Sequence, residues 1–437
     1  MIVLPVLVLI FALHGAARTL PGAEPLSFPI IRKRNPKFLT KRDNMIVLEN
    51  VSTLTYLIRL QIGTPPQPVD VVLDTGSFEL WVDPICSTAA TEEQAEQCNL
   101  AGMYYPGLSS SYIDRNSTSK LAYGKGAVEF SYAADRILIP GSNLQSLENV
   151  VFGIGQSSHD LAWGIAGIGH GEGFNTRYNN LIDELFMQGV TQSRAFSISL
   201  GSQFDDNAGT VVFGGIDTRK FSGSLHRFDN LPPQLEGRKN GPWRYWIQLD
   251  SVGLTKPGWM PKTYATAPMP ALLDTGSTWS YLPPEIVDGL TRDLDTGGWE
   301  DGSYRVPCSM KSHPGSIDFA FGNLTIHVPY AEFITEFDGG HCALGVLPKE
   351  EHTDSVILGD SFLRSAYVVF DQTNQELFLA RSAHCGTNKK TLSPEAGAAS
   401  RFIGECHHAD GIPSPLPMGL VVAPFALVFW IVGLLLC

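Results

Sequence analysis

The feature of this sequence that most constrains its fold is a tetrapeptide that occurs twice, each time behind apolar residues. The chain reads "VVLDTGSFELWV" at Val71–Val82 and "ALLDTGSTWSYL" at Ala271–Leu282. With ordinary residue frequencies, a given tetrapeptide turns up in roughly one of several hundred chains of this length. A matched pair is far rarer, so the repeated Asp-Thr-Gly-Ser indicates a duplicated structural unit.

A second motif follows each tetrapeptide at a similar distance. Ile165-Ala166-Gly167 ends 93 residues after Asp74, and Ile357-Leu358-Gly359 ends 85 residues after Asp274. Each half of the chain therefore carries Asp-Thr-Gly and, later, two apolar residues followed by Gly. This recurrence predicts one lobe that has been duplicated.

The rest of the sequence favours strands over helices. Short apolar and β-branched runs are separated by turns rich in Gly, Pro, Asn and Asp, and only Asn179–Gly189 and Pro283–Leu294 have convincing helical patterns. We predict a mostly β, bilobal protein with an N-terminal β-lobe at 43–230 and a C-terminal β-lobe at 231–386.

The chemistry of the repeated tetrapeptide follows from its position. A carboxylate on a Gly-containing turn directly after a buried strand is directed out of the core, and two such loops meeting about a dyad bring two carboxyls into one site. Like charges roughly 3 Å apart cannot both ionise, so one pKa falls and the other rises. The ionised member can then take a proton from a water molecule while the protonated member donates to a substrate carbonyl.

The combination of motifs resembles the pepsin-like aspartic proteases. It includes both tetrapeptides, both apolar-apolar-Gly segments, "LWV" after the first tetrapeptide and "SVILGDSFLRSAYVVFDQTNQELFLA" near the end, and it covers about residues 55–382. The resemblance implies two β-lobes with an active-site cleft between them, and the shared proton is a known property of that family. It also implies that Asp74 and Asp274 are the catalytic residues. The residues that match the family's supporting groups, with the serines as donors to the outer carboxylate oxygens, are Thr75, Gly76, Ser77, Thr275, Gly276 and Ser277.

The resemblance further implies a hairpin, or flap, that closes over the cleft. Its tyrosine matches Tyr123 in "KLAYGKGAVEFSYAADRILI", which Gly124 and Lys125 follow, and the tryptophan that donates to this tyrosine matches Trp81. Tyr123 and Ile165 are then expected to line the pocket for the residue before the cleaved bond.

Two charged features favour different cleavage sites. Lys125 on the flap would repel a basic residue before the cut, because at an effective dielectric of 20 like charges about 6 Å apart repel by roughly 3 kcal/mol. Glu92, Glu93 and Glu96 lie in a predicted acidic loop near the rim of the cleft, which would attract a basic residue. Because the loop is farther away, we expect a large apolar residue before the cut and only a mild basic preference farther out.

Other chemistries have less support. The third Asp-Thr-Gly, at Asp295–Gly297, lacks a preceding apolar strand and a following Ser, so we predict a helix end and turn there. The His residues show no HExxH and no zinc-type spacing with Cys, and no Gly-x-Ser-x-Gly occurs. We expect no metal and no cofactor, and the net charge of −13 argues against a nucleic-acid partner.

The N-terminal part of the chain has the pattern of a processed leader. Residues 1–17 are apolar and end in small residues, which predicts a signal peptide. Residues 18–42 carry seven Lys or Arg and one Glu and end in the dibasic pair Lys41-Arg42, which predicts a propeptide that is cut there. Its net charge is +6 and the remainder of the chain has −19, so we expect it to lie across an acidic cleft. A merely solvated basic arm is the alternative.

The C-terminal part predicts a surface tether. Residues 387–409 are polar and small, as in a stalk, and 410–437 are expected to be a removed GPI-signal tail. Gly419–Cys437 is uncharged and long enough to span a bilayer, but no basic residue follows it, so a GPI signal is favoured over an ordinary membrane span. The candidate attachment residues are Ala409, Asp410 and Gly411.

Secretion would make the cysteines pair and some asparagines carry glycans. Cys437 would leave with the tail, and six cysteines formally allow fifteen arrangements. The simplest pairing by proximity is Cys86 with Cys98, Cys308 with Cys342, and Cys385 with Cys406. The glycosylation sequons are at Asn50, Asn116 and Asn323.

These observations predict a secreted, surface-tethered aspartic endopeptidase, active at acidic pH and made as a zymogen. Its layout resembles the fungal GPI-anchored yapsin-like enzymes. We expect it to be a monomer that acts on peptides and proteins and is inhibited by pepstatin-type compounds. The alternatives are a catalytically silent pepsin-like binding protein and a cell-surface adhesin, although no residue of the dyad, its turns or the flap is damaged.

Overall fold

The computed structural model describes residues 25–34, 54–83, 86, 92–124, 126–138, 146–159, 161, 163–204, 209–233, 241–264, 267–300, 302–337, 340–349 and 356–407. Among these residues, no helix is both long and apolar enough to cross a membrane. Several predictions lie outside the described residues: the signal peptide, the Lys41-Arg42 cut, the Asn50 sequon, Lys125, and the tail with Ala409, Asp410 and Gly411.

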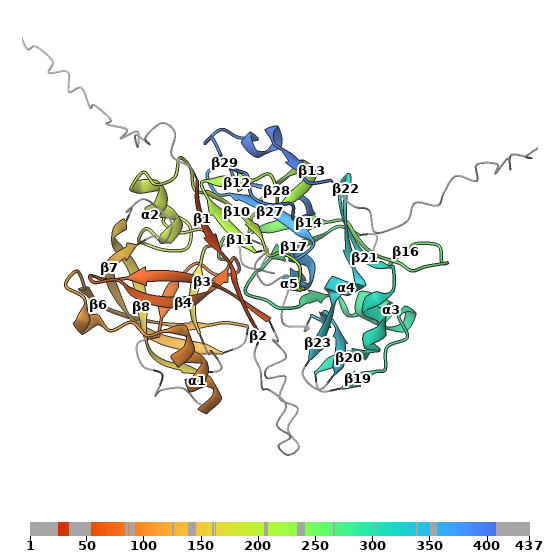
Figure 1. Ribbon diagram of the computed structural model, residues 1–437, viewed down its shortest axis with the longest axis horizontal. Helices are drawn as coiled ribbons and strands as arrows, with labels where there is room; N and C mark the ends of the chain where they lie inside the picture. Colours follow the sequence, from red (N-terminus) through yellow and green to blue (C-terminus); the bar gives the residue numbers. More distant parts are fainter. Residues whose placement is uncertain are drawn as a thin grey trace, which may run out of the picture. The chain divides into compact units, whose positions relative to one another are not determined.

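One large sheet forms most of the first half and is drawn in orange and yellow in Figure 1. Its strands, in sheet order, are β2 (Ile31–Arg34), β3 (Leu54–Ile62), β4 (Gln67–Asp74), β9 (Gly164–Gly167), β5 (Leu80–Val82), β8 (Ser146–His159), β7 (Ala127–Leu138) and β6 (Ile113–Ala122). β6 and β7 form a hairpin whose turn begins at Tyr123.

The second half builds three smaller sheets. Their strands, in sheet order, are β14 (Trp246–Leu249), β17 (Met269–Leu273), β26 (Val356–Leu358), β18 (Ser280–Leu282) and β25 (Val346–Pro348); β16 (Lys262–Thr263), β15 (Ser251–Thr255), β21 (Ser316–Phe321) and β22 (Leu324–Pro329); and β19 (Trp299–Glu300), β20 (Ser303–Val306), β24 (His341–Leu344) and β23 (Ile334–Phe337). The mostly β prediction is confirmed.

A seven-stranded sheet is shared by the two halves. Its strands, in sheet order, are β1 (Leu26–Pro29), β11 (Thr210–Phe213), β10 (Ala195–Ser199), β27 (Ala366–Asp371), β28 (Glu376–Ser382), β13 (Phe221–Asp229) and β30 (Ile403–Glu405). The stacked rings of Phe196 and Phe370, whose centroids lie 4.9 Å apart, join β10 of the first half to β27 of the second. The described residues up to His407 accordingly form one compact unit, within which the two predicted lobes share this sheet.

Helices are few and short. The two predicted helices are present as α2 (Leu181–Met187) and α3 (Pro284–Asp293), and Asn180 and Asp183 form a capping box at the start of α2. Other helices with fully described bounds are α1 (Glu92–Ala101), α4 (Tyr330–Phe333), α5 (Asp360–Leu363) and the short 3-10 helices η2 (Pro106–Leu108), η3 (Cys308–Ser312) and η4 (Ala398–Arg401). α1 occupies most of the stretch that we predicted to be an acidic loop, so that prediction was wrong from Glu92 onward.

The third Asp-Thr-Gly is a helix end and turn, as predicted. α3 ends at Asp293, and Asp295 adopts a left-handed backbone conformation with φ of 52°. The chain then turns through Gly298 into β19.

The described part of the basic leader is folded into the sheets. β1 pairs with β11 at one edge of the shared sheet, and β2 pairs with β3 at the edge of the large sheet. Leu26, Phe28 and, just after β1, Ile30 are buried, while the residues between them are more exposed. This alternation is expected for a strand that turns one face to the core. Strand pairing and apolar burial therefore hold these leader residues, and not charge alone as we had expected.

The predicted stalk is also folded, as far as His407. β29 (Lys389–Thr391) pairs with β12 (Gly215–Asp217), and β30 adds the last strand of the shared sheet. Leu392, Ala398 and Ala399 are buried against the body of the protein. The prediction of a stalk was therefore wrong for 387–407. Although this segment is polar overall, its few apolar residues are buried and its two strands pair with β12 and β13, which is enough to hold it on the body.

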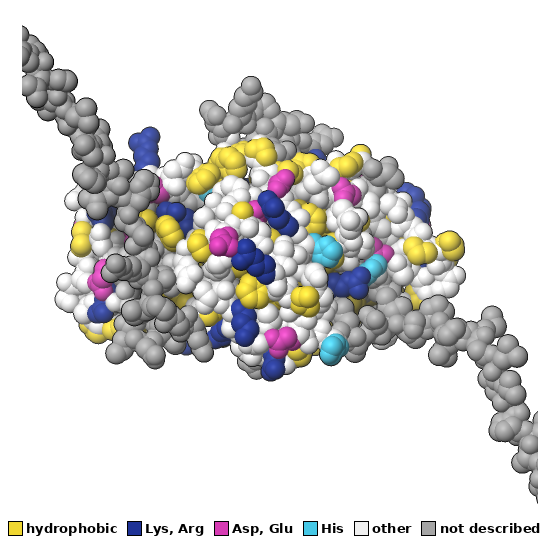
Figure 2. Space-filling view, turned by 90° about the horizontal axis from the view of Figure 1, so that it is seen from above, with side chains coloured by type: hydrophobic (Ala, Val, Ile, Leu, Met, Phe, Trp, Pro, Cys, Tyr) yellow, Lys and Arg dark blue, Asp and Glu magenta, His cyan; other side chains and the backbone are white. Residues whose placement is uncertain are grey.

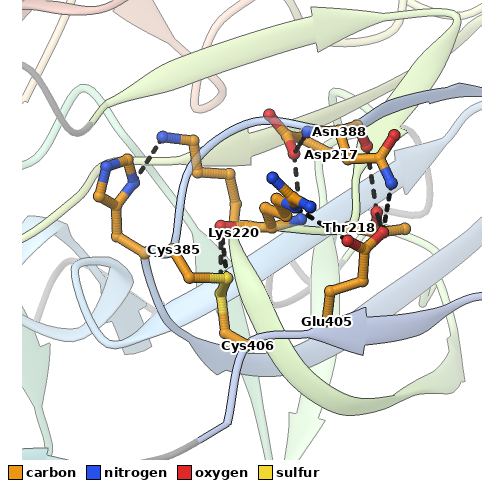
Figure 3. Close-up of a disulfide and its surroundings, with 9 residues drawn as sticks. Asp217, Thr218, Lys220, Cys385, Asn388, Glu405 and Cys406 are labelled. Carbon is orange, nitrogen blue, oxygen red and sulfur yellow. Dashed lines mark hydrogen bonds and ion pairs between the residues drawn. A yellow bond between two sulfur atoms is a disulfide. The ribbon is translucent and has the colours of Figure 1, made fainter.

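A disulfide fastens this C-terminal segment, as Figure 3 shows. Cys385 bonds to Cys406, and Glu405 accepts hydrogen bonds from Thr218 Oγ1 at 2.6 Å and Arg219 Nε at 2.9 Å. The hydroxyl of Thr218 and the guanidinium of Arg219 lower the pKa of the Glu405 carboxyl to about 2.

All three disulfides join the cysteines that were paired by proximity. They are Cys86–Cys98, Cys308–Cys342 and Cys385–Cys406. Both described sequons, at Asn116 and Asn323, have exposed asparagines. On the face seen in Figure 2, Lys and Arg side chains are interspersed with Asp and Glu side chains, so the negative charge of the chain is not gathered there.

Candidate active site

Parallel strand pairs position the two tetrapeptide loops. β4, which ends in Asp74, pairs in parallel with β9, and β17, which precedes Asp274, pairs in parallel with β26. β9 and β26 are the two apolar-apolar-Gly segments, so the sequence repeat is a structural repeat. A methyl group on Gly167 would lie 2.6 Å from the Glu79 backbone nitrogen, which explains why Gly ends the first segment.

The two loops are braced against each other by their threonines. Thr75 Oγ1 donates to the Leu273 carbonyl at 2.8 Å and accepts from the Thr275 backbone N–H at 3.0 Å. Thr275 Oγ1 donates to the Leu73 carbonyl at 2.6 Å and accepts from the Thr75 backbone N–H at 3.1 Å. Four buried hydrogen bonds with two-fold symmetry therefore fix the distance between the loops.

This bracing brings the two carboxyls together. Gly76 N–H donates to Asp74 Oδ1 at 2.7 Å, and Gly276 N–H donates to Asp274 Oδ1 at 2.8 Å. Each glycine also faces the opposite carboxyl. A methyl group on Gly76 would lie 2.5 Å from Asp274 Oδ1, and one on Gly276 would lie 2.5 Å from Asp74 Oδ1. Only glycine leaves room for two carboxyls at this point.

The two serines do not play the same part. Ser77 Oγ donates to Asp74 Oδ2, as the resemblance implied. Ser277 Oγ instead donates to the Trp279 carbonyl at 3.0 Å, so the expected bond from Ser277 to Asp274 was wrong. The two halves are related by duplication, but the side chain of Ser277 turns back onto its own loop.

The surroundings of Asp274 favour the protonated form of its carboxyl. Its burial, and then repulsion from Asp74, raise the pKa of the Asp274 carboxyl well above its usual range. The Gly276 N–H and the Arg244 guanidinium oppose this rise in pKa.

Two of the predicted flap residues, Tyr123 and Gly124, lie at the tip of the β6–β7 hairpin. Tyr123 N–H donates to the Gly126 carbonyl at 3.0 Å at the tip of the hairpin, and Gly124 is exposed there. Trp81 Nε1 donates to the Tyr123 hydroxyl at 2.9 Å. Burial, and then the charge of Asp74, raise the pKa of the Tyr123 hydroxyl, so it stays a neutral donor and acceptor.

Known proteins agree with this geometry. Residues 55–382 match the family described as eukaryotic aspartyl protease, which is well over half of the chain. This chain belongs to that family. It is 34% identical to the probable aspartic-type endopeptidase opsB of Aspergillus fumigatus, over 89% of this chain and 83% of that protein. The acid protease of Saccharomycopsis fibuligera is 32% identical over 80% of this chain and 87% of its own length. The aspartic proteinase yapsin-3 of Saccharomyces cerevisiae is 29% identical over 86% of this chain and 76% of its own length.

This aspartic-type endopeptidase has an apolar cluster beneath its flap. Trp81, Val128, Phe130 and Ile165 are buried in it. The half-buried members of the cluster are Val72, Leu121, Tyr123, Tyr132 and Leu161. Ile165 and Tyr123, the two predicted pocket residues, are thus brought together with Trp81.

A buried carboxyl beside this cluster was not found from the sequence. Glu79 accepts hydrogen bonds from the hydroxyls of Tyr132, at 3.0 Å, and Tyr178. Burial raises the pKa of Glu79, while both tyrosine hydroxyls oppose the rise. Tyr178 lies far from the flap in sequence, so no local pattern could have linked it to Glu79.

A second missed carboxyl lies next to the second tetrapeptide loop of the protease. Asp360 begins α5 and its backbone N–H donates to the Ser277 carbonyl at 2.8 Å. Burial raises the pKa of Asp360, the charge of Arg364 opposes the rise, and the charge of Asp274 adds to it. The only available signal was the "LGD" that ends the second apolar-apolar-Gly motif.

Arg244 is the third residue that the sequence did not reveal. Leu273 N–H donates to the Tyr245 carbonyl at 3.1 Å, which continues the antiparallel pairing of β14 and β17 by one residue. Arg244 comes directly before Tyr245, and its positive charge acts on the Asp274 carboxyl, which directly follows β17. Within the described part of the chain, no three His, Cys, Asp or Glu side chains are placed to hold a metal ion.

Proposed function

We propose that Asp74 and Asp274 are the catalytic pair of this endopeptidase and that they share one proton over acidic pH. A water molecule between them gives a proton to Asp74 as its oxygen attacks the substrate carbonyl carbon. Asp274 donates its proton to the carbonyl oxygen, which yields a tetrahedral diol. Asp74 then gives its proton to the amide nitrogen while Asp274 takes a proton from one hydroxyl of the diol, and the C–N bond breaks to leave a carboxylic acid and an amine.

The observation that carries this proposal is the threonine brace with its two glycines. Four hydrogen bonds hold the loops, and each glycine leaves space for the opposite carboxyl, so the pair is preorganised before substrate arrives. An adhesin would not need two carboxyls held together in this way. The intact carboxyls and flap also oppose a silent binding protein.

Hydrolysis in water enriched in ¹⁸O tests the proposed chemistry. If water is the nucleophile, a single turnover of a synthetic peptide puts one ¹⁸O into each new carboxylate and leaves no covalent adduct on the protein. A pepstatin-type inhibitor should suppress the reaction, and the inhibited sample is the control. An acyl-enzyme trapped by acid quenching would contradict the proposal.

We propose that the residue before the cleaved bond is large and apolar. The apolar cluster around Trp81, Ile165 and Tyr123 supports this, since it offers hydrophobic contact beside the dyad. Lys125 remains the proposed barrier to a basic residue at that position. A cleavage profile on a random peptide pool, compared with that of Lys125→Asp, should show more cutting after Lys or Arg in the variant. A strong preference for Lys or Arg in the unmodified enzyme would contradict it.

We propose that the enzyme is secreted, glycosylated and tethered at the cell surface by a GPI anchor on its C-terminal part. Three disulfides and exposed sequons at Asn116 and Asn323 support passage through the secretory route. The folded body ends at His407, just before the candidate attachment residues.

Deletion of 408–437 should therefore release soluble enzyme with unchanged activity per molecule, because the strands and loops that hold the site all lie before His408. Phosphatidylinositol-specific phospholipase C should release the intact protein from cells, with untreated cells as the control. A C-terminus detected in the cytoplasm would instead indicate a membrane span.

A further inference from the structure

Three alternating residues, beginning with the last of the first tetrapeptide, each make polar contacts near the flap. Ser77 Oγ donates to the Asp74 carboxyl, and Trp81 Nε1 donates to the Tyr123 hydroxyl at 2.9 Å. Between these two residues in the chain, the Glu79 carboxyl accepts hydrogen bonds from two tyrosine hydroxyls. Glu79 is thus placed between the contact to the dyad and the contact to the flap.

The carboxyl of Glu79 is buried and its charge reaches the flap tyrosine. Only 6% of Glu79 is exposed. Burial and then the charge of Asp74 raise the pKa of the Tyr123 hydroxyl, and the charge of Glu79 adds to this rise. Burying a carboxyl is costly unless hydrogen bonds compensate for the lost water. An apolar side chain would fill the same space at a lower cost, so the contribution of Glu79 lies in its hydrogen bonds.

The two tyrosines that bond to Glu79 come from different segments. Tyr132 lies on β7, the strand that runs back from the flap tip, and donates to Glu79 Oε1 at 3.0 Å. Tyr178 lies in the loop before α2 and donates to Glu79 Oε2. The two rings also pack edge-on, with centroids 5.6 Å apart. One carboxyl therefore joins the first tetrapeptide loop, the flap strand β7 and the loop before α2.

Two of these three segments are fixed by other hydrogen bonds. The Glu79 carbonyl accepts from the Gly167 N–H at 2.9 Å, which ties its backbone to β9. At the end of the loop before α2, Asn180 Nδ2 donates to the Gly169 carbonyl at 2.9 Å. The carboxyl and the Tyr178 hydroxyl are therefore held on firm backbone before Tyr132 joins them.

The flap strand is the segment that Glu79 can restrain. The pairing of β7 with β8 changes register between Glu129 and Phe130, so the ladder is interrupted there. Tyr132 lies two residues farther along β7, and its ring packs edge-on against Phe130 with centroids 5.0 Å apart. Phe130 belongs to the apolar cluster that also includes Tyr123. A hold on Tyr132 therefore reaches the flap tyrosine through Phe130.

We propose that Glu79 is a positioning residue for the flap. Its carboxyl fixes Tyr132, and with it the flap strand, to two rigid segments, so that more of the free enzyme has the flap in its substrate-binding position. The proposal rests on the proposed roles of the dyad and the flap. Glu79 acts through Tyr132 and not on the reacting atoms.

The split between KM and kcat tests this role. Glu79→Ala removes the acceptor for both hydroxyls, and a smaller fraction of enzyme with a correctly placed flap lowers the apparent affinity by that fraction. We expect KM for a synthetic peptide to rise at least about fivefold while kcat stays within about twofold. Glu79→Gln keeps the shape and can still bond both hydroxyls, so its KM should stay within about twofold of the unmodified enzyme. An unchanged KM in Glu79→Ala, or a loss in kcat alone, would overturn the inference.

Hydrogen exchange measures the flap without catalysis. Deuterium uptake by peptides from β6 and β7 should be faster in Glu79→Ala than in the unmodified enzyme or Glu79→Gln, with no change in the second half of the chain. Glu129→Ala is the matched control, because it removes an exposed carboxylate and its surface pair with Lys120 from the same hairpin. It should change neither uptake nor KM. Faster uptake along the whole chain in Glu79→Ala would show a merely structural role and overturn the inference.

Tyr132→Phe decides the question if Glu79→Ala does not fold. It keeps the ring and removes one hydroxyl, so KM should rise about threefold and uptake by β6 and β7 should increase. Unchanged KM and uptake in Tyr132→Phe would overturn the inference. If no variant and no unmodified sample hydrolyses peptides, the proposed catalysis is refuted, and the exchange measurements still decide whether Glu79 holds the flap.

Discussion

Replacing Arg244 by Met should move the pH profile of peptide hydrolysis toward higher pH. Arg244 lies just before β14, the strand that pairs with β17, and its positive charge lowers the pKa of the Asp274 carboxyl. Removing the cation favours the protonated carboxyl, so Asp274 gives up the shared proton only at higher pH. The alkaline limb of the profile, where that proton is lost, should therefore move to higher pH.

The size of the shift follows from the distance between the two charges. Residues that face each other on neighbouring strands have Cβ atoms about 5 Å apart, so we take the two charges to be about 7 Å apart. At an effective dielectric of 20 this distance corresponds to about 2.4 kcal/mol. Because Arg244 is half-buried, we discount this value to about 1 kcal/mol for solvent screening, which equals about 0.7 pH unit.

The assay is kcat/KM for one uncharged synthetic peptide, measured from acidic to neutral pH at fixed ionic strength. Arg292→Met is the control, because it removes the same charge from an exposed position that does not act on Asp274. An alkaline limb that stays in place in Arg244→Met, or that moves to lower pH, would refute the reasoning. A shift of the same size in Arg292→Met would show a general charge effect instead.

Further predictions concern the brace and its glycines. Thr275→Val keeps the shape but removes the donor to the Leu73 carbonyl and the acceptor for a backbone N–H, so thermal or urea unfolding should show a loss of about 2–5 kcal/mol; a change below about 0.5 kcal/mol would contradict the brace. Gly76→Ala should abolish peptide hydrolysis because its methyl group would collide with the Asp274 carboxyl, whereas Gly107→Ala, with nothing within 4 Å, should leave activity unchanged. Normal turnover by Gly76→Ala would show that the carboxyls lie elsewhere.

Much of the site could be predicted because it is local and repeated. The Asp-Thr-Gly turns, their threonines and the apolar-apolar-Gly segments recur in one order in both halves, and each residue type has a direct physical reason at its place. α2 and α3 also carry their own signals, such as the capping box at Asn180. The disulfides followed from short separations along the chain.

The missed features depend on pairings between distant segments. Arg244 gains its place only from the register of β14 against β17, and Glu79 gains its partner Tyr178 only when the chain folds back. Ser277 differs from Ser77 by a side-chain orientation that no sequence pattern records.

Both ends of the described chain were misjudged for the same reason. β1 and β30 are short edge strands in polar or basic surroundings, and composition gives such segments no helical or alternating signal long enough to recognise. Their stability comes from the neighbouring strand, since β1 depends on β11 and β30 on β13. A strand of this kind can be predicted only together with its partner.

The most direct test of the shared-proton dyad is kcat/KM at acidic pH for the unmodified enzyme, Asp74→Asn, Asp274→Asn and the double variant. Circular dichroism and thermal unfolding confirm that each is folded. If the two carboxyls act as one unit, each single variant loses all measurable turnover, at least about a thousandfold, and the double variant is no worse than either single one. Appreciable turnover in one single variant, or a double variant whose loss is the product of two partial losses, would contradict a shared dyad.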